Sequence, residues 1–107
     1  MTPTVQLSID DKDIKANVPH LVGCWSFNTE VVPSMMFLTI NGKQHDQNLQ
    51  SQINEDNKTY DVYSWSNVTF TKTENRKEIS CGARWRNKDF TSESETIIVS
   101  CKHDILY

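Results

Sequence analysis

The sequence lacks the features by which membrane-spanning, nucleic-acid-binding and metal-binding proteins are recognised. Its longest mostly apolar run, residues 31–40, contains Pro33, Ser34 and Thr39, so no segment is suited to cross a bilayer. Its 11 basic residues are mixed with 14 acidic ones, which leaves a formal net charge of -3 and no basic stripe for nucleic acid. The three cysteines lack the close spacing of zinc or redox motifs. We therefore expect no membrane insertion, no nucleic-acid partner, no metal and no other cofactor.

The chain is also short and poor in hydrophobic residues. Its 107 residues suit one domain, which we expect to span residues 1–107. The hydrophobic share of 36% is low for a globular protein but suits a thin β-sandwich, in which half of every strand faces water. Met1 is not followed by a basic and apolar signal region, so we expect the chain to be a fragment of a longer secreted protein.

No helical apolar stripe is present, and short alternating runs separated by polar turns predict an all-β fold. Val5, Leu7 and Ile9 share one face of the first run, and Asn41-Gly42 closes the third run with a tight-turn signal. A polar crossover containing one helical turn is expected over residues 73–77. We predict seven antiparallel strands, at residues 5–9, 18–27, 35–40, 49–53, 60–70, 78–85 and 95–101.

Two of the cysteines are placed to join the two sheets of a sandwich. Cys24 and Cys81 lie on the second and sixth predicted strands with their side chains on the core face, and a disulfide there would stabilise the fold by roughly 4 kcal/mol. The alternative is three reduced, buried thiols in a cytosolic protein. Seven short strands with cysteines at these positions are the pattern of an immunoglobulin β-sandwich with Greek-key connections. Two positions depart from that pattern, because Phe37 or Leu38 stands where a buried tryptophan is usual and Ile79 replaces a tyrosine.

Several segments resemble, in the right order, segments of antibody constant domains. Residues 57–62 (NKTYDV) resemble the Asn-Ser-Thr-Tyr-Arg-Val segment that carries the Fc glycan, and residues 79–83 (ISCGA) resemble a Tyr-x-Cys-x-Val strand. Residues 2–7 (TPTVQL) and 66–70 (SNVTF) are similar to the first strand and to the strand that follows the glycan segment. The chain therefore resembles a constant-type (C1-set) domain of an antibody heavy chain.

This resemblance implies a secreted, non-catalytic structural domain of adaptive immunity. Phe90-Thr91 followed by Cys101 resembles the end of the second constant domain of an IgM- or IgE-like heavy chain, where such a cysteine joins two chains. The domain would then form a homodimer through Cys101 and one sheet face, and would link antigen-binding arms to the effector region. Neighbouring constant domains and an Fc receptor or other cell-surface protein would be further partners. An odd cysteine also fits an unpaired thiol or a partner cysteine outside this chain.

Two other functions stay open, because receptors share much of this sequence pattern. An immunoglobulin-like ectodomain of a cell-adhesion or immune receptor would bind a different protein on the outside of the cell. A T-cell receptor constant domain would pair with a non-identical chain. No motif brings serine, histidine and aspartate together, and a thin sandwich offers no deep pocket, so we expect no enzyme.

Trp25, Trp65 and Leu21 are expected on the outer side of one sheet. Trp25 follows the inward Cys24, and Trp65 has the outward parity on a neighbouring strand. The three residues therefore predict an exposed apolar patch of the kind that marks an interface. In the alternative, one or both indoles fold beneath a loop or fill the core.

Two N-glycosylation sequons begin at Asn57 and Asn67. Asn57 lies in a polar loop, and Asn67 alternates with the inward Val68, so both are expected to be exposed. Asn67 shares its face with Trp65, where a glycan would cover the apolar patch.

Two further groups are interpreted as surface residues that bind no ligand. The three histidines are far apart and show no metal-ligand spacing: His20, His45 and His103. The three aspartates after the first run lack the glycine and distal glutamate of a calcium loop, so we expect a solvated turn: Asp10, Asp11 and Asp13.

Overall fold

The computed structural model describes residues 3–10 and 13–100, which form a β-sandwich. The only helical element in these residues is one 3₁₀ turn, η1 (Lys72–Glu74). The strands are β1 (Gln6–Ile9), β2 (Asp13–Lys15), β3 (Pro19–Thr29), β4 (Met35–Ile40), β5 (Lys43–Gln47), β6 (Gln50–Ile53), β7 (Tyr60–Thr69), β8 (Glu78–Trp85), β9 (Lys88–Thr91), β10 (Glu95–Thr96) and β11 (Ile98–Ser100).

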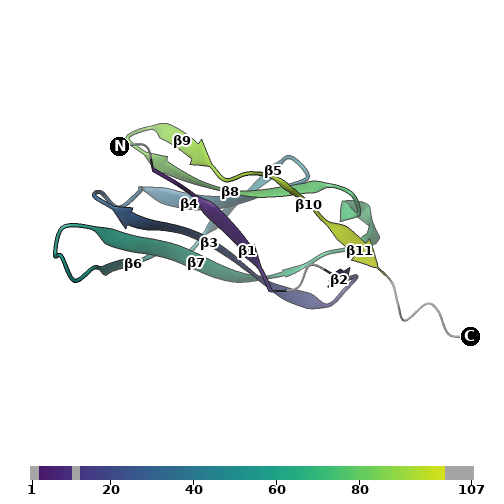
Figure 1. Cartoon of the computed structure of the whole chain (residues 1–107). Helices are drawn as coiled ribbons and strands as arrows, with labels where there is room; N and C mark the ends of the chain where they lie inside the picture. Colours follow the sequence, from purple (N-terminus) through teal and green to yellow (C-terminus); the bar gives the residue numbers. More distant parts are fainter. Residues whose placement is uncertain (1–2, 11–12, 101–107) are drawn as a thin grey trace, which may run out of the picture.

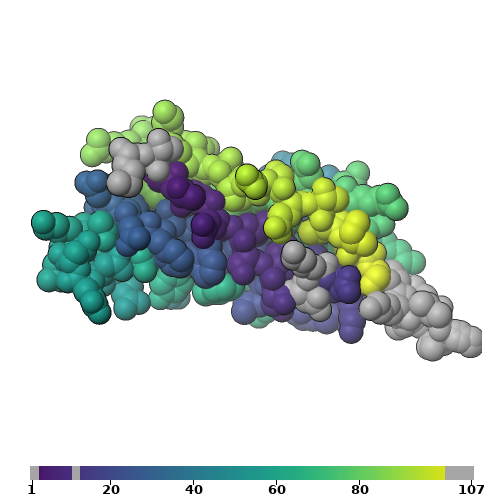
Figure 2. All heavy atoms as spheres, in the orientation of Figure 1, coloured from purple at the N-terminus to yellow at the C-terminus, as the bar shows by residue number. Residues whose placement is uncertain are grey.

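The strands form two antiparallel sheets that face each other (Figure 1). The first sheet has the order β1-β3-β7-β6, and the second has the order β10-β8-β4-β5 with β9 also paired to β8. A separate parallel pair joins β2 to β11, so the C-terminal strands lie beside the N-terminal segment, as the yellow and purple spheres of Figure 2 show. The predicted sandwich is confirmed. The second and fifth predicted strands correspond to β3 and β7, which pair side by side.

The strand count and direction differ from the prediction, because β2, β5 and β9 were not predicted and one pairing is parallel. Residues 43–47 were expected to be an irregular polar stretch but form β5, an edge strand whose side chains are almost all exposed and therefore show no apolar alternation. Asp13, which was expected in a solvated turn, begins β2, and the last predicted strand is divided into β10 and β11. The β2–β11 pair is parallel. A constant-type sandwich has no strand equivalent to β5 beside β4, so the second sheet is wider than the resemblance implied.

The core lies between the sheets around a disulfide. Cys24 on β3 and Cys81 on β8 are bonded, with Cα atoms 5.6 Å apart and a sequence separation of 57, which confirms the predicted bridge. Side chains alternate between the two sides of a strand, so every second residue of β3 and β8 points toward the core that holds the disulfide. The most deeply buried side chains around it belong to Ile14, Val22, Met36, Leu38, Val62, Phe70 and Ile79.

The buried indole of this core comes from β8. Met36 and Leu38 fill the inward positions of β4, where the immunoglobulin pattern usually has tryptophan. Trp85, at the end of β8, is 8% exposed, and its Nε1 donates a 2.6 Å hydrogen bond to the carbonyl oxygen of Val31. That bond satisfies the polar atom of a largely buried indole.

The prediction that His20 lies on the surface is wrong. His20 is 5% exposed, because strand alternation places it on the same side of β3 as Val22 and Cys24. Its Nε2 accepts a 3.1 Å hydrogen bond from the Lys15 backbone N–H, and its Nδ1 lies 3.4 Å from an Asp10 carboxylate oxygen. These two contacts give a buried polar ring partners on both sides.

The remaining surface assignments have mixed outcomes. His45 is exposed on β5, whereas His103 and Asp11 lie outside the described residues. Asp10 accepts a hydrogen bond from the Leu21 backbone N–H, so it ties the end of β1 to β3, and Asp13 begins β2. The expected helical turn is η1. No helix within residues 3–10 and 13–100 has the length and hydropathy needed to traverse a membrane.

Candidate functional site

The outer side of the first sheet carries a line of apolar side chains. In the β3–β7 register, Leu21 lies opposite Asn67, Gly23 opposite Trp65, and Trp25 opposite Tyr63. Residues directly opposite each other in an antiparallel pair point to the same side of the sheet. Because Cys24 points into the core, its neighbours on β3 point outward, toward solvent.

Trp65 lies directly on the β3 backbone at Gly23. A Cβ atom built on Gly23 would come within 2.3 Å of the Trp65 ring, closer than any real contact of this kind. Only the missing side chain of glycine therefore admits the indole at this position. The opposite surface of the ring stays open, since Trp65 is 46% exposed.

Trp25 connects Trp65 to Phe27. The Trp25 and Trp65 rings meet edge to face at 5.9 Å between centroids, and the Trp25 and Phe27 rings are tilted at 5.0 Å. Leu21 and Phe27 are 40% and 49% exposed. We call Leu21, Trp25, Phe27 and Trp65 the aromatic face. Its four members form one contiguous apolar surface across β3 and β7, a feature that marks interaction sites.

The aromatic face has uncharged neighbours on both adjoining strands. Gln6 and Ser8 of β1 lie opposite Trp25 and Gly23, and Gln50 of β6 lies opposite Tyr63. All three side chains point to the same side as the indoles. The centre of the aromatic face is therefore bordered by amide and hydroxyl groups, while Asp61 of β7, which lies opposite Gln52 and two residues before Tyr63, adds one carboxylate to the same side of the sheet.

The structure brings together the three residues that the sequence nominated for this face. Trp25, Trp65 and Leu21 all lie outside the buried core cluster, which excludes the alternative in which an indole fills the core. Sequence reasoning missed Phe27, although its position two residues after Trp25 on one strand was a sufficient signal. The role of Gly23 had no such signal, because it depends on the register between two distant strands.

Both sequon asparagines are exposed. Asn67 lies opposite Leu21, at the edge of the aromatic face. Asn57 lies in the loop between β6 and β7 and has a left-handed backbone with φ of 57°, a conformation that asparagine tolerates well. Cys101, the residue expected to join two chains, lies outside the described residues.

The loop that carries Asn57 is held by a carboxylate. Asp56 Oδ1 accepts hydrogen bonds of 2.8 and 3.0 Å from the backbone N–H groups of Lys58 and Thr59. These bonds stabilise the ionised carboxylate, so they lower the pKa of Asp56 below its usual value. The Thr59 hydroxyl, which belongs to the sequon, also bonds to Asp56.

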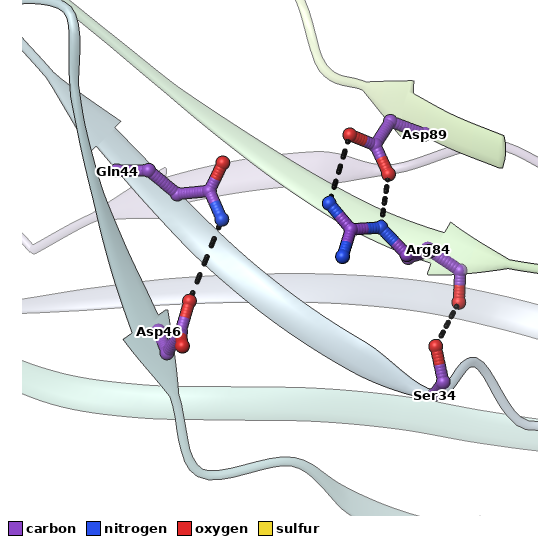
Figure 3. A network of polar contacts seen from close by, with 5 residues as sticks. All are labelled: Ser34, Gln44, Asp46, Arg84 and Asp89. Carbon is purple, nitrogen blue, oxygen red and sulfur yellow. Dashed lines mark hydrogen bonds and ion pairs between the residues drawn. The ribbon is translucent and has the colours of Figure 1, made fainter. Parts of the chain in front are cut away.

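The outer side of the second sheet has a different chemistry (Figure 3). Phe37 lies over Gly82 much as Trp65 lies over Gly23, but it is only 3% exposed. Arg84 Nε donates a 2.7 Å hydrogen bond to Asp89 Oδ1, and Figure 3 shows the guanidinium bonded to both carboxylate oxygens. This pairing lowers the pKa of Asp89 and raises that of Arg84. Charged groups therefore occupy the second sheet, and exposed aromatic rings occupy the first.

No protein family model and no curated protein sequence matches this chain. Among solved structures, it is similar to the full ectodomain (Ig1–Ig3) of mouse nectin-like molecule 4, with a TM-score of 0.74 and 11% sequence identity. The similarity covers 91% of this chain and 34% of that one, so this chain spans about a third of the ectodomain. The fold is immunoglobulin-like. At this identity the comparison establishes the fold alone.

Proposed function

We propose that this chain is an extracellular, non-catalytic immunoglobulin-like domain that pairs with a second copy of itself through the aromatic face. The observation that carries the proposal is the exposure of Leu21, Phe27 and Trp65 around Trp25 on one open sheet face. Tryptophan is enriched among the residues that contribute most to protein–protein binding. The disulfide-bonded core supports a secreted or cell-surface location, since such bonds persist in oxidising compartments.

The uncharged neighbours on β1 and β6, beside the centre of the aromatic face, favour a second copy as the partner. A two-fold interface brings the same surface of both subunits together, so any charge near its centre meets a like charge. Gln6, Ser8 and Gln50 border this face and carry no charge. Self-association therefore buries the indoles without electrostatic repulsion from these neighbours.

Different observations support two larger proteins to which the domain would belong. The similarity of residues 57–62 and 79–83 to antibody segments supports a heavy-chain constant domain, in which Cys101 would form a second link between the two copies. The added edge strand β5 and the likeness to a three-domain ectodomain support a cell-adhesion or immune receptor instead. Pairing through the aromatic face is common to both proposals.

Sedimentation equilibrium of the unglycosylated Cys101→Ser chain tests the sheet contact apart from any disulfide. We expect a monomer–dimer equilibrium that Trp65→Ser shifts strongly toward monomer, because an exposed indole is lost from the centre of the interface. Ile98→Ser is the matched control, since Ile98 is 52% exposed but lies on β11, outside the aromatic face. Circular dichroism of each variant verifies that it is folded.

Two results would contradict the proposed pairing. One is a Cys101→Ser chain that stays monomeric even at the concentrations used for NMR. The other is a dimer that Ile98→Ser weakens as much as Trp65→Ser does. Reducing and non-reducing gels of the unsubstituted chain report separately on Cys101, whose disulfide would appear as a dimer only without reductant.

A further inference from the structure

A cavity of about 790 Å³ opens at the end of the sandwich, apart from the centre of the aromatic face. Its walls come from the end of β3, the loop that leads to β4, and the hairpin between β8 and β9. In Figure 1 these segments lie at the end of the long axis opposite to β11. The volume is within the range of sites that bind small molecules.

Most of the surface that lines this cavity is apolar. Trp85 and Phe90 contribute two rings that meet edge to face at 5.7 Å, and Val31 and Phe27 add further apolar side chains. Two polar atoms of the lining are already paired: Trp85 Nε1 and Thr29 Oγ1 both donate hydrogen bonds to the Val31 carbonyl oxygen, at 2.6 and 2.7 Å. A ligand therefore meets hydrocarbon and aromatic surface over most of the interior.

One polar atom at the cavity has no partner. Ser26 lines the cavity and is 1% exposed, and its hydroxyl has no hydrogen-bond partner within residues 3–10 and 13–100. Buried hydroxyls are normally paired, so this one is an exception. Because its oxygen has almost no accessible surface, it adds little to the polarity that a ligand meets.

The rim carries an excess of one positive charge. Arg86 and Lys88 contribute two positive charges and Glu30 contributes one negative charge. None of the ion pairs found in the described part of the chain involves these three residues. The rim is also well defined, because Arg86 and Asn87 both have positive φ angles, of 50° and 66°, as in the tight two-residue turn of a type I′ hairpin.

We propose that this cavity binds an amphipathic anion with one alkyl chain, such as a long-chain carboxylate. The chain lies against the apolar side chains of Trp85, Phe90 and Val31. The carboxylate stays at the mouth near Arg86 and Lys88, which are both exposed; the Lys88 ammonium lies over the Phe90 ring, 5.6 Å from its centroid. A single negative charge matches the net charge of the rim.

The test is an NMR titration of the folded chain with dodecanoate below its critical micelle concentration. We expect saturable binding to one site, with chemical-shift changes at Val31, Trp85 and Lys88, residues that belong to the cavity alone. The Arg86→Ala/Lys88→Ala variant should bind roughly tenfold more weakly, because two rim charges are lost. Glu30→Gln should bind more tightly, because its removal leaves the rim more positive.

Controls separate this site from general detergent binding. Val31→Asp adds a negative charge to an exposed part of the wall and should weaken binding, whereas Val18→Asp changes a residue of similar exposure elsewhere and should not. Dodecyltrimethylammonium, which has the same chain and the opposite charge, should bind much more weakly. Phe27 belongs to both the cavity and the aromatic face, so the titration is repeated with the Trp65→Ser chain, which is expected to be monomeric.

Three results would overturn the proposal. The first is the absence of saturable dodecanoate binding. The second is equal binding of dodecanoate and dodecyltrimethylammonium, or no effect of the Arg86→Ala/Lys88→Ala change. The third is chemical-shift change concentrated at Leu21 and Trp65, which would place the ligand on the aromatic face.

Discussion

The Trp65 indole on β7 occupies the space that a side chain at Gly23 on β3 would fill. Gly82 and Phe37 repeat the arrangement on the second sheet. Both glycines adjoin a disulfide cysteine, since Gly23 precedes Cys24 and Gly82 follows Cys81. Each aromatic ring therefore packs across the outside of the strand whose inner side holds the bridge.

Gly23→Ala is expected to destabilise the domain by about 1–3 kcal/mol, because the added methyl group overlaps the Trp65 ring and forces it to move. Urea unfolding measures the change. In the Trp65→Ala background the same glycine substitution should cost much less, so the two changes should be strongly non-additive. Ser51→Thr, which adds a methyl group at an exposed strand position, is the control and should stay within about 0.5 kcal/mol of the parent. If Gly23→Ala and Trp65→Ala had additive effects on the free energy of unfolding, the contact between Trp65 and Gly23 would be contradicted.

Replacing both bridge cysteines by alanine should lower the free energy of unfolding by about 2–5 kcal/mol, because the disulfide closes a long loop in the unfolded chain. Cys101→Ser is present in both proteins, so that no other thiol takes part. Chemical denaturation of the two proteins gives the difference in their free energies of unfolding. An unchanged midpoint would mean that the bridge contributes nothing to stability.

His20→Leu should destabilise the fold by about 1–3 kcal/mol, even though leucine is apolar and the site is buried. The substitution removes the acceptor of the Lys15 N–H and the partner of Asp10, and a polar group left unpaired in a buried site is costly. His45→Leu changes an exposed histidine on β5 and should have an effect within about 0.5 kcal/mol. Equal effects at the two positions would refute the role given to the buried ring.

The decrease of the free energy of unfolding at low pH should depend on Asp56. Its folded pKa lies below the ordinary 3.8, so its contribution is present above pH 3.8 and is lost as the pH falls through the lower folded value. Asp56→Ala, which cannot accept the two loop N–H bonds, should therefore reduce the loss of stability below about pH 4. Urea midpoints across that range for the two proteins measure the difference. Parallel curves would show that the loop bonds are not linked to folding.

A glycan at Asn67 should abolish pairing through the aromatic face, because it would be attached opposite Leu21. In a eukaryotic secretory host, we expect the Cys101→Ser protein to sediment as a monomer when Asn67 is occupied. Asn67→Gln should restore the dimer, whereas Asn57→Gln, in a loop beyond β6, should leave the monomer unchanged. Mass spectrometry establishes occupancy at each site. A dimer that persists with a glycan on Asn67 would place the contact on another surface.

Period-two alternation and the cysteine positions were enough to predict the sandwich, the disulfide and the outward direction of Trp25 and Trp65. Each of these depends on residues within one strand or on a single pairing. The same rule, applied to His20 as strictly as to Cys24, predicts that this histidine is buried. Its hydrogen-bond partners could not have been foreseen, because they lie on a turn and on β2.

What the sequence did not reveal depends on how separate segments meet. β5 has no apolar alternation because it is an exposed edge strand, and its pairing to β4 becomes visible only in the register. The end cavity likewise combines Ser26 and Val31 with Trp85 and Lys88, which are far apart along the chain. No sequence pattern within any one of these segments indicates that they line the same cavity.

The parallel pairing of β2 with β11 also has a mechanical consequence. These strands run in the same direction and are matched over three residues, from Asp13–Ile98 to Lys15–Ser100. A tension that draws β2 toward its own start and β11 toward its own end slides the two strands past each other. Their hydrogen bonds then share the load and must break together, as they would not in a hairpin opened from one end. If neighbouring domains pulled this domain along its long axis, the β2–β11 pair would resist the extension.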